Sequence, residues 1–371
     1  MKSYKNLFDQ MLSDEAIELA IKNATKNKNT KVYITPYLEN RNNTFESART
    51  WLTKYQTIKH RPVEIYDGIS RKKRTIIVPS TIEIVVQHSV VQVLMPIFMK
   101  GMYQHSYASI PNRGAHKAKK YVEKWIRKDP RNVKYCLKMD IRHFFESIPH
   151  DILKTKLKKI IRDEKMLDIL YKIIDTTEQG LPLGFYTSQW LANWYLQGLD
   201  HYIKEQLHAK YYVRYMDDMV IFGSNKRELH KMLEAIMDYL NEELKLEIKD
   251  NWQIFRFDYT DKKGKHRGRD LDFMGFRFFR YKTILRRSIM LKASRKAKKI
   301  YKKEKATVYE LRQFISYLGW IKATDTYNFY LKHIKPYVSI QYCKRRISRY
   351  QKRVNKEVSN VVRTAMCGCQ T

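Results

Sequence analysis

The 371-residue chain carries 73 lysines and arginines against 38 aspartates and glutamates, which gives a formal net charge of +35. So large a positive excess favours a polyanion as the binding partner. Apolar residues make up 43% of the chain and aromatic residues 13%, enough for a sizeable core, so a chain disordered throughout is excluded. We find no run of about 18 uncharged apolar residues and no secretory signal at the start, so a cytoplasmic protein is expected.

The four cysteines carry no recognisable chemistry. Cys136, Cys343, Cys367 and Cys369 are too few and too unevenly spaced for a disulfide framework. The closing Cys-Gly-Cys has no second pair at zinc-site spacing, so we expect reduced thiols without a functional role.

Helical patterns occupy much of the chain. The first 60 residues read as helical, although no chemistry is apparent there. Apolar residues then recur every three or four positions in three runs, Asp151 to Ile174, Ser188 to Glu205 and Lys226 to Leu244.

Strand-like runs rich in β-branched and aromatic residues lie between these helices. They comprise Tyr135 to Ile141, the two arms around Met216-Asp217-Asp218, and Leu271 to Phe279. A polar and basic loop is expected at residues 261–270. The order of elements predicts an α+β fold, in which helices pack on an antiparallel sheet.

The last 91 residues have a composition of their own. Residues 281–371 contain 23 lysines and arginines against four acids, and apolar residues such as Leu311, Phe314 and Leu318 recur at helical spacing. Between Lys292 and Lys305 there is a single acid. We predict a small helical bundle whose basic surface follows phosphates.

Three acids stand where apolar strands end. Asp217 and Asp218 interrupt the apolar sequence YYVRYMDDMVIFG, which places them at the tip of a hairpin. Adjacent acids are common at turns, but Asp140 ends a second apolar strand 77 positions earlier. If the two strands are neighbours, three carboxylates converge, and a hard cation is needed to neutralise them. Magnesium is the expected occupant, and two such ions can drive in-line displacement at phosphorus.

Seven motifs in order identify the chain as resembling a prokaryotic reverse transcriptase. They are KKRTIIVP (72–79), SYASIPNRGAHKA (106–118), LKMDIRHFFESIPHDIL (137–153), LPLGFYTSQWLANWYL (181–196), RYMDDMVIFG (214–223), LKLEIKDN (244–251) and LDFMGFRF (271–278). The resemblance implies a right-hand polymerase fold, with an N-terminal helical extension at residues 1–60, fingers and palm at 61–280, and a basic thumb and tail at 281–371.

The resemblance also implies site residues. Asp140 and Asp217 match the metal ligands of the family, with Asp218 as the supporting acid and the backbone of Ile141 beside them. Magnesium, as two ions, is the implied cofactor. The residues implied to bind the incoming deoxynucleoside triphosphate are Lys72, Arg74, Phe145, Leu183, Gly184, Ser188, Gln189 and Tyr215, and Lys73 can share the role of Lys72.

Each of these assignments has a physical reason and an alternative. An arginine fork binds phosphate oxygens, and glycine lets the backbone approach a substrate. The resemblance implies that the ring of Phe145 lies beneath the sugar and leaves no room for a 2′-hydroxyl. Phe145 also fits a core aromatic, and Ser188 also fits a helix N-cap. Met274 and Gly275, within LDFMGF, match the primer grip, although ordinary strand core explains them almost as well.

Departures from the common pattern narrow the subfamily. Leu183 stands where most relatives have Gln, and Gln189 where they have Pro; this LGxxxSQ pattern resembles diversity-generating retroelement reverse transcriptases. YKNLFDQML (4–12), LRRSIM (285–290) and SYLGWIKATDTYNF (316–329) are similar to flanking segments of that family. It implies error-prone copying at template adenine and a small basic accessory protein that forms a pentamer. A reverse transcriptase of an anti-phage defence system and a catalytically silent RNA-binding scaffold remain the alternatives.

Overall fold

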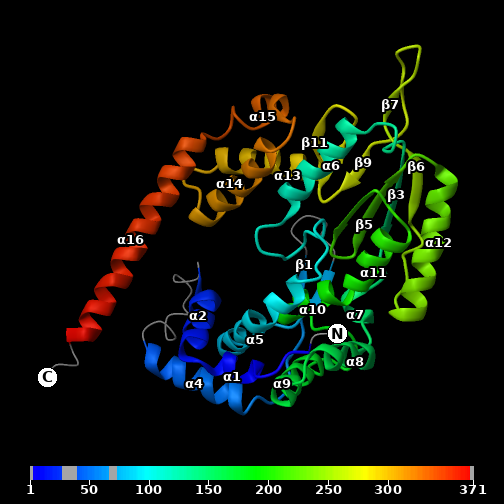
Figure 1. The fold of residues 1–371 in the computed structure, drawn as a ribbon. Coiled ribbons are helices and arrows are strands. Elements are labelled where there is room, and N and C mark those ends of the chain that lie inside the picture. Colours follow the sequence, from blue (N-terminus) through cyan, green and yellow to red (C-terminus); the bar gives the residue numbers. More distant parts are fainter. Residues whose placement is uncertain (1–2, 27–39, 67–72, 368–371) are drawn as a thin grey trace. The chain divides into compact units, whose positions relative to one another are not determined.

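The structure is a computed structural model that describes residues 3–26, 40–66 and 73–367 (Figure 1). The chain forms two compact units, Met1–Arg256 and Phe257–Thr371. The division into an extension, fingers with palm, and thumb, at residues 60 and 280, stays a prediction.

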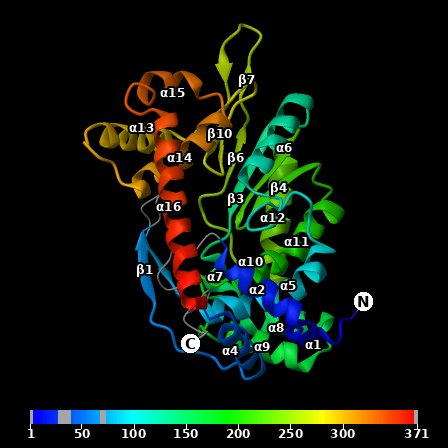
Figure 2. The same ribbon diagram turned by 90° about the vertical axis from the view of Figure 1, so that its left-hand side faces the viewer.

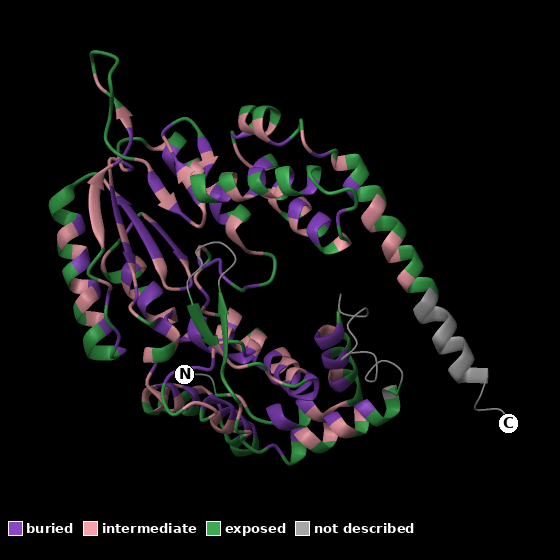
Figure 3. Cartoon of the chain, turned by 180° about the vertical axis from the view of Figure 1, so that it is seen from behind, coloured by how far each residue is buried: buried purple, intermediate pink, exposed green. Residues whose placement is uncertain are grey.

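A four-stranded antiparallel sheet organises the first unit. Its strands lie in the order β4 (Tyr211–Tyr215), β5 (Asp218–Gly223), β3 (Tyr135–Asp140) and β6 (Gln253–Arg256). Four consecutive residues of β5, from Met219 to Phe222, are buried, because helices cover the sheet (Figure 3). Helix α12 (Lys226–Glu243) contacts β3, β5 and β6 and buries an apolar stripe that includes Leu229, Leu233 and Ile236 (Figure 1).

A helical layer completes this unit. Helices α1 (Leu7–Leu12), α2 (Asp14–Thr25) and α4 (Arg41–Thr53) pack against the long helix α5 (Thr81–Met99). Helix α5 also contacts α10 (Tyr186–Tyr195), and α6 (Ala115–Lys128) contacts β4. The start of α5 is fixed by a capping box, in which the Ser80 hydroxyl accepts from the Glu83 N–H and the Glu83 carboxylate accepts from the Ser80 N–H.

Helix α5 corrects one expectation from the sequence. By length and composition it is apolar enough to cross a membrane, although 56% of that stretch is buried inside the protein. We expected no run of about 18 uncharged apolar residues, because this segment contains one acid and several polar residues. Its mean hydropathy is nevertheless high. Its apolar side chains contact neighbouring helices of the first unit, as those of a core helix do.

A small hairpin of β1 (Val63–Tyr66) and β2 (Lys73–Ile76) forms a separate two-stranded sheet (Figure 2). Both strands are exposed along almost their whole length. The hairpin therefore has little core of its own.

Two predicted helices of the first unit are each divided. The run from Asp151 to Ile174 forms α8 (His150–Ile160) and α9 (Glu164–Ile174), because the Asp163 carboxylate caps α9 by accepting from the Met166 N–H at 3.1 Å. The run from Ser188 to Glu205 forms α10, α11 (Gln197–His201) and a π-helical turn at Tyr202–Gln206. Helix α7 (Phe144–Ser147) is a single turn after β3.

The second unit combines short strands with helices. Strands β9 (Leu271–Phe273), β10 (Phe276–Phe278) and β11 (Thr283–Leu285) form an antiparallel sheet, and β7 (Tyr259–Thr260) pairs with β8 (His266–Arg267). The predicted single strand at Leu271–Phe279 is thus wrong. Met274 and Gly275 both have positive φ, 53° and 85°, and form a tight turn between β9 and β10.

Four helices follow, in agreement with the expected bundle: α13 (Arg287–Tyr301), α14 (Val308–Lys322), α15 (Tyr327–His333) and α16 (Ile340–Cys367). Helices α13 and α16 both contact α14. Cys136 and Cys343 are both buried, and Cys369 lies outside the described residues.

Candidate active site

The three acids predicted from the sequence lie at one end of the four-stranded sheet. Asp218 begins β5 and is the register partner of Asp140, the last residue of β3. Asp217 occupies the two-residue turn between β4 and β5, next to Met216, whose φ is 59°. The N–H of Ile141 donates to the Asp217 carbonyl at 3.3 Å, which ties the end of β3 to the tip of the hairpin.

The electrostatics of this end of the sheet are those of a carboxylate pair. Burial and the neighbouring charge of Asp140 raise the pKa of Asp217 to about 6, against smaller opposing effects of Lys249 and Arg74. Asp140 is paired with the Lys249 ammonium, and Lys138 lies 4.0 Å from the Asp218 carboxylate. Positive charge supplied by lysines thus offsets part of the repulsion between the acids.

A buried ion pair supports the hairpin from behind, and sequence reasoning missed it. The side chains of Arg214, on β4, and Asp200, on α11, are both 0% exposed and form a bidentate ion pair. Arg214 Nη2 donates to Asp200 Oδ2 at 2.6 Å, and Arg214 Nε donates to Asp200 Oδ1 at 2.8 Å. Tyr212 donates to the same Asp200 carboxylate at 2.8 Å. Such a pair is tolerated in a core when its remaining polar atoms are bonded as well.

The same guanidinium reaches the turn itself. Arg214 Nη1 donates to the Met216 carbonyl at 3.2 Å and to Asn193 Oδ1 at 3.1 Å. Asn193 in turn donates to the Ala108 carbonyl at 3.0 Å, which links the turn to α10 and to the preceding loop. Arg214 is therefore a positioning residue for the strained turn that carries Asp217. The one signal in the sequence was an arginine inside an otherwise apolar strand.

The segment after β3 carries Phe145. Phe144 is buried in the core as expected, whereas Phe145 is half-buried, and the two rings meet edge to face with centroids 5.5 Å apart. The Phe145 carbonyl accepts from the Leu181 N–H at 2.6 Å, and a Cβ on Gly180 would lie 2.5 Å from that carbonyl oxygen. A glycine is needed there because the two segments approach so closely.

The fourth motif lies beside the chain that leaves β2. The Leu183 carbonyl accepts from the Ile77 N–H at 2.7 Å, and Gly184 has a φ of +112° with its Cβ direction blocked by the Ile77 carbonyl. Ser188 is buried in the first turn of α10, which starts after Phe185, so an N-cap role for Ser188 is wrong. Gln189 is half-buried on the same helix, and Tyr215 is half-buried at the end of β4.

The remaining predicted residues are spread over both units. Arg74 lies on the exposed strand β2 and is close enough to Asp217 to lower its pKa. Lys73 pairs with Glu64 across the hairpin at 2.7 Å, and Lys72 lies outside the described residues. Met274 and Gly275 form the β9–β10 turn of the second unit, where the Gly275 carbonyl accepts from the Arg286 N–H at 2.9 Å.

The acids fit a magnesium site that is completed by substrate. Within the described ranges, no group of three His, Cys, Asp or Glu side chains is arranged as a metal site. Magnesium, however, is commonly held by one or two carboxylates together with substrate phosphates and water. The carboxylates of Asp140 and Asp217, of which the first raises the pKa of the second, are a donor set of that type.

Comparisons of sequence relate the chain to known proteins. The family described as "Reverse transcriptase (RNA-dependent DNA polymerase)" matches residues 59–278. The Retron Ec73 reverse transcriptase of Escherichia coli is 26% identical over 201 residues, which cover 49% of this chain and 61% of that protein. The group II intron-encoded protein LtrA of Lactococcus lactis is 26% identical over 204 residues, 52% of this chain and 32% of that protein. The matched part of this chain thus spans about one third to three fifths of the length of these relatives.

A solved structure agrees on the fold. Apo telomerase from Candida tropicalis superposes with a TM-score of 0.50 at 15% identity, over 71% of this chain and 54% of that one. This likeness, with the mixture of helices and antiparallel sheet, confirms the predicted α+β right-hand polymerase fold. Because the family match covers more than half of its residues, the chain belongs to the reverse transcriptase family.

Proposed function

We propose that this chain is an RNA-directed DNA polymerase that copies a structured template RNA into cDNA. The observation that carries the proposal is the placement of Asp140, Asp217 and Asp218 at one end of the sheet, in a chain that belongs to this family. The excess of 35 positive charges supports RNA and the RNA–cDNA duplex as partners. The retron and intron relatives support the same reaction.

In this proposal Asp140 and Asp217 hold two magnesium ions, with the Ile141 carbonyl as a further ligand and Asp218 as a supporting charge. When bound, the ions would activate the primer hydroxyl and stabilise the leaving oxygen at phosphorus. Arg74 binds the phosphates of the incoming deoxynucleoside triphosphate through its guanidinium. Phe145 sits beneath the sugar and excludes a 2′-hydroxyl.

We further propose that the enzyme belongs to a diversity-generating retroelement and copies template adenine with frequent errors. The support is the LGxxxSQ sequence with Leu183 in place of glutamine. A glutamine amide can hydrogen-bond and hold pairing geometry, whereas leucine supplies shape alone and penalises a mispair less. The proposed partner is a small basic accessory protein that forms a pentamer, and the proposed location is the cytoplasm.

Primer extension on a defined RNA tests this assignment. We expect Leu183→Gln to lower the error frequency opposite template adenine while errors opposite the other three bases change little. An unchanged spectrum would contradict the role of Leu183.

Sequencing cDNA made from RNA that co-purifies with the protein identifies the natural template. A template repeat paired with a variable gene region is the expected result. A non-coding RNA from a defence operon would contradict the diversification role, and protein inert with magnesium, template and dNTPs would indicate a scaffold.

A further inference from the structure

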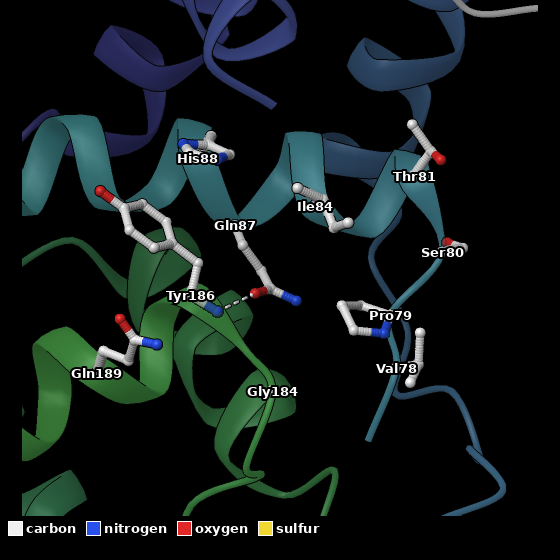
Figure 4. Close-up of a pocket in the computed structure, with 10 residues that line it drawn as sticks. All are labelled: Val78, Pro79, Ser80, Thr81, Ile84, Gln87, His88, Gly184, Tyr186 and Gln189. Carbon is white, nitrogen blue, oxygen red and sulfur yellow. Dashed lines mark hydrogen bonds between the residues drawn. The ribbon is translucent and has the colours of Figure 1, made fainter. Parts of the chain in front are cut away.

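A strongly basic hairpin in the second unit has no role in the function proposed above. The β7–β8 hairpin, residues 259–270, contains five lysines and arginines among its twelve residues. Residues 262–269 are all exposed, and Figure 3 shows this turn in green. By contrast, the described residues that line a pocket of about 650 Å³ between the starts of α5 and α10 include no lysine or arginine (Figure 4). Positive charge is thus gathered at particular places, and this hairpin is one of them.

The acids that flank the hairpin already have partners elsewhere in the second unit. Asp258 is buried, and its carboxylate accepts from the Arg280 N–H at 2.9 Å. Asp270 forms a bidentate ion pair with Arg277 at 2.7 and 2.8 Å. Within the part of the chain that the structure describes, no acid forms an ion pair with the three lysines of the turn, Lys262, Lys263 and Lys265.

Asp261 gives the turn its shape. Its Oδ1 accepts from the N–H groups of Lys263 and Lys265, both at 2.9 Å, and its Oδ2 accepts from Arg267 Nε at 3.1 Å. The Asp261 carbonyl also accepts from the N–H of Gly264, which has a φ of 77°. The exposed lysines are therefore displayed on a turn held by its own hydrogen bonds. Such preorganisation lowers the entropy that binding costs.

The chain enters this hairpin from the end of the four-stranded sheet that lies opposite to the acids. Strand β6 ends at Arg256, whose register partner is Tyr135, the first residue of β3. Asp140 is the last residue of the same strand. The chemistry proposed at the acids therefore leaves the charge of the hairpin without a use.

We propose that the β7–β8 hairpin binds the phosphates of a double-stranded stem in the template RNA, outside the segment that is being copied. The proposal rests on the RNA-templated function above. Double-stranded RNA is recognised mainly by its shape and its phosphates, whereas single strands are commonly held by aromatic side chains that stack on the bases. Residues 261–270 supply cations but no Phe, Tyr or Trp, and they include no apolar side chain that would insert into a membrane.

The test measures how the full chain binds an RNA duplex of about 16 base pairs, the length that a double-stranded-RNA-binding domain spans. Fluorescence anisotropy is recorded over a range of salt concentrations, in EDTA and without dNTPs. The triple variant Lys262→Gln, Lys263→Gln and Lys265→Gln should bind roughly threefold to 100-fold more weakly, as the loss of three exposed ionic contacts provides. The slope of log affinity against log salt should become shallower by about 2 to 3, because each phosphate contact contributes roughly 0.7–0.9.

A matched control removes the same charge from the first unit. Lys158, Lys159 and Arg162 are exposed at the end of α8 and just after it. Their replacement by glutamine should change the slope by less than about 1. Equal losses in the two triple variants would mean that net charge alone attracts the RNA, and would overturn the proposal.

Two other probes distinguish the kind of ligand. On a single-stranded RNA of the same length the hairpin variant should lose less affinity than on the duplex, and an equal loss would contradict a duplex site. Vesicles that contain phosphatidylserine should bind wild type and the hairpin variant alike. A loss of vesicle binding with duplex binding unchanged would assign the hairpin to a membrane surface instead.

Asp261→Ala separates a shaped site from a cloud of charge. This substitution adds one net positive charge, but it removes the acceptor that orders the turn. We expect weaker binding of the duplex, and equal or tighter binding would contradict a preformed site. If the hairpin binds the duplex but wild-type protein makes no cDNA, the proposed polymerase function fails while this site stands. Synthesis of cDNA by a protein whose duplex affinity is independent of the hairpin gives the reverse.

Discussion

The β4–β5 hairpin and the β1–β2 hairpin both carry residues predicted to act on the same nucleotide, yet they are held very differently. Behind the tip of β4–β5 lie Arg214 and Asp200, both fully buried and bonded to each other, to Asn193 and to the turn. In β1–β2 almost every described residue is exposed, and the Lys73–Glu64 pair is a charged contact across the strands. The proposed function accounts for this difference: acids that are to hold cations need fixed geometry, whereas a cation that is to bind a phosphate can stay solvated until substrate arrives.

The sharpest way to break this comparison is Arg214→Met. It leaves the Asp200 carboxylate buried without its guanidinium, so we expect unfolding free energy to fall by about 3–5 kcal/mol. Urea denaturation measures the loss. The matched control, Arg74→Met on exposed β2, should change stability by less than about 0.5 kcal/mol. Similar losses in both variants would mean that the two hairpins are not held differently.

The second prediction concerns the exposed β1–β2 hairpin, where a substitution should lower activity and leave stability unchanged. Arg74→Gln removes a charged donor to phosphate, which is worth about 1.5–3 kcal/mol, so kcat/KM for a dNTP should fall roughly 10-fold to 100-fold with stability unchanged. Steady-state primer extension measures it. Arg61→Gln, also exposed and just before β1, removes the same charge and should have little effect. Equal losses of kcat/KM in the two variants would mean that Arg74 acts only through its contribution to the positive charge of the surface.

The third prediction concerns the link between the exposed hairpin and the fourth motif. At Gly184 the φ of +112° and a Cβ position 2.1 Å from the Ile77 carbonyl both oppose a side chain. We expect Gly184→Ala to cost about 1–3 kcal/mol in thermal or urea unfolding. Gly114, with a φ of +131° and nothing within 4 Å of its Cβ position, is the control for backbone strain alone. A loss no greater than that of Gly114→Ala would mean that the contact with Ile77 yields easily.

Sequence reasoning predicted the sheet and the hairpin because apolar alternation and a turn with acids are local signals. Asp140 needed one further assumption, that its strand lies beside the hairpin, and the register with Asp218 places it there. Arg214 was missed because its partner Asp200 lies on a helix that only the fold brings underneath the strand.

The predicted ends of helices and strands were wrong for a different reason. The break before α9 depends on a single side-chain cap by Asp163, and the break in Leu271–Phe279 depends on positive φ at Met274 and Gly275. The periodicity of apolar residues is judged over about a dozen residues, so it does not detect a break that depends on one or two of them. The predicted roles of the nucleotide-binding and primer-grip residues stay predictions, since they describe contacts with substrates.

Primer extension by wild-type protein and Asp217→Asn on a defined RNA template, each with magnesium and with EDTA, tests the central claim most directly. Wild-type protein should incorporate dNTPs with magnesium and none with EDTA. Asp217→Asn should incorporate dNTPs more than about 100-fold more slowly, because changes to residues that only contact a metal ligand already cost roughly 10-fold to 100-fold. It should bind the template RNA as tightly as wild type. Incorporation by Asp217→Asn at the wild-type rate would contradict the assignment of these acids as the metal-binding centre of a polymerase.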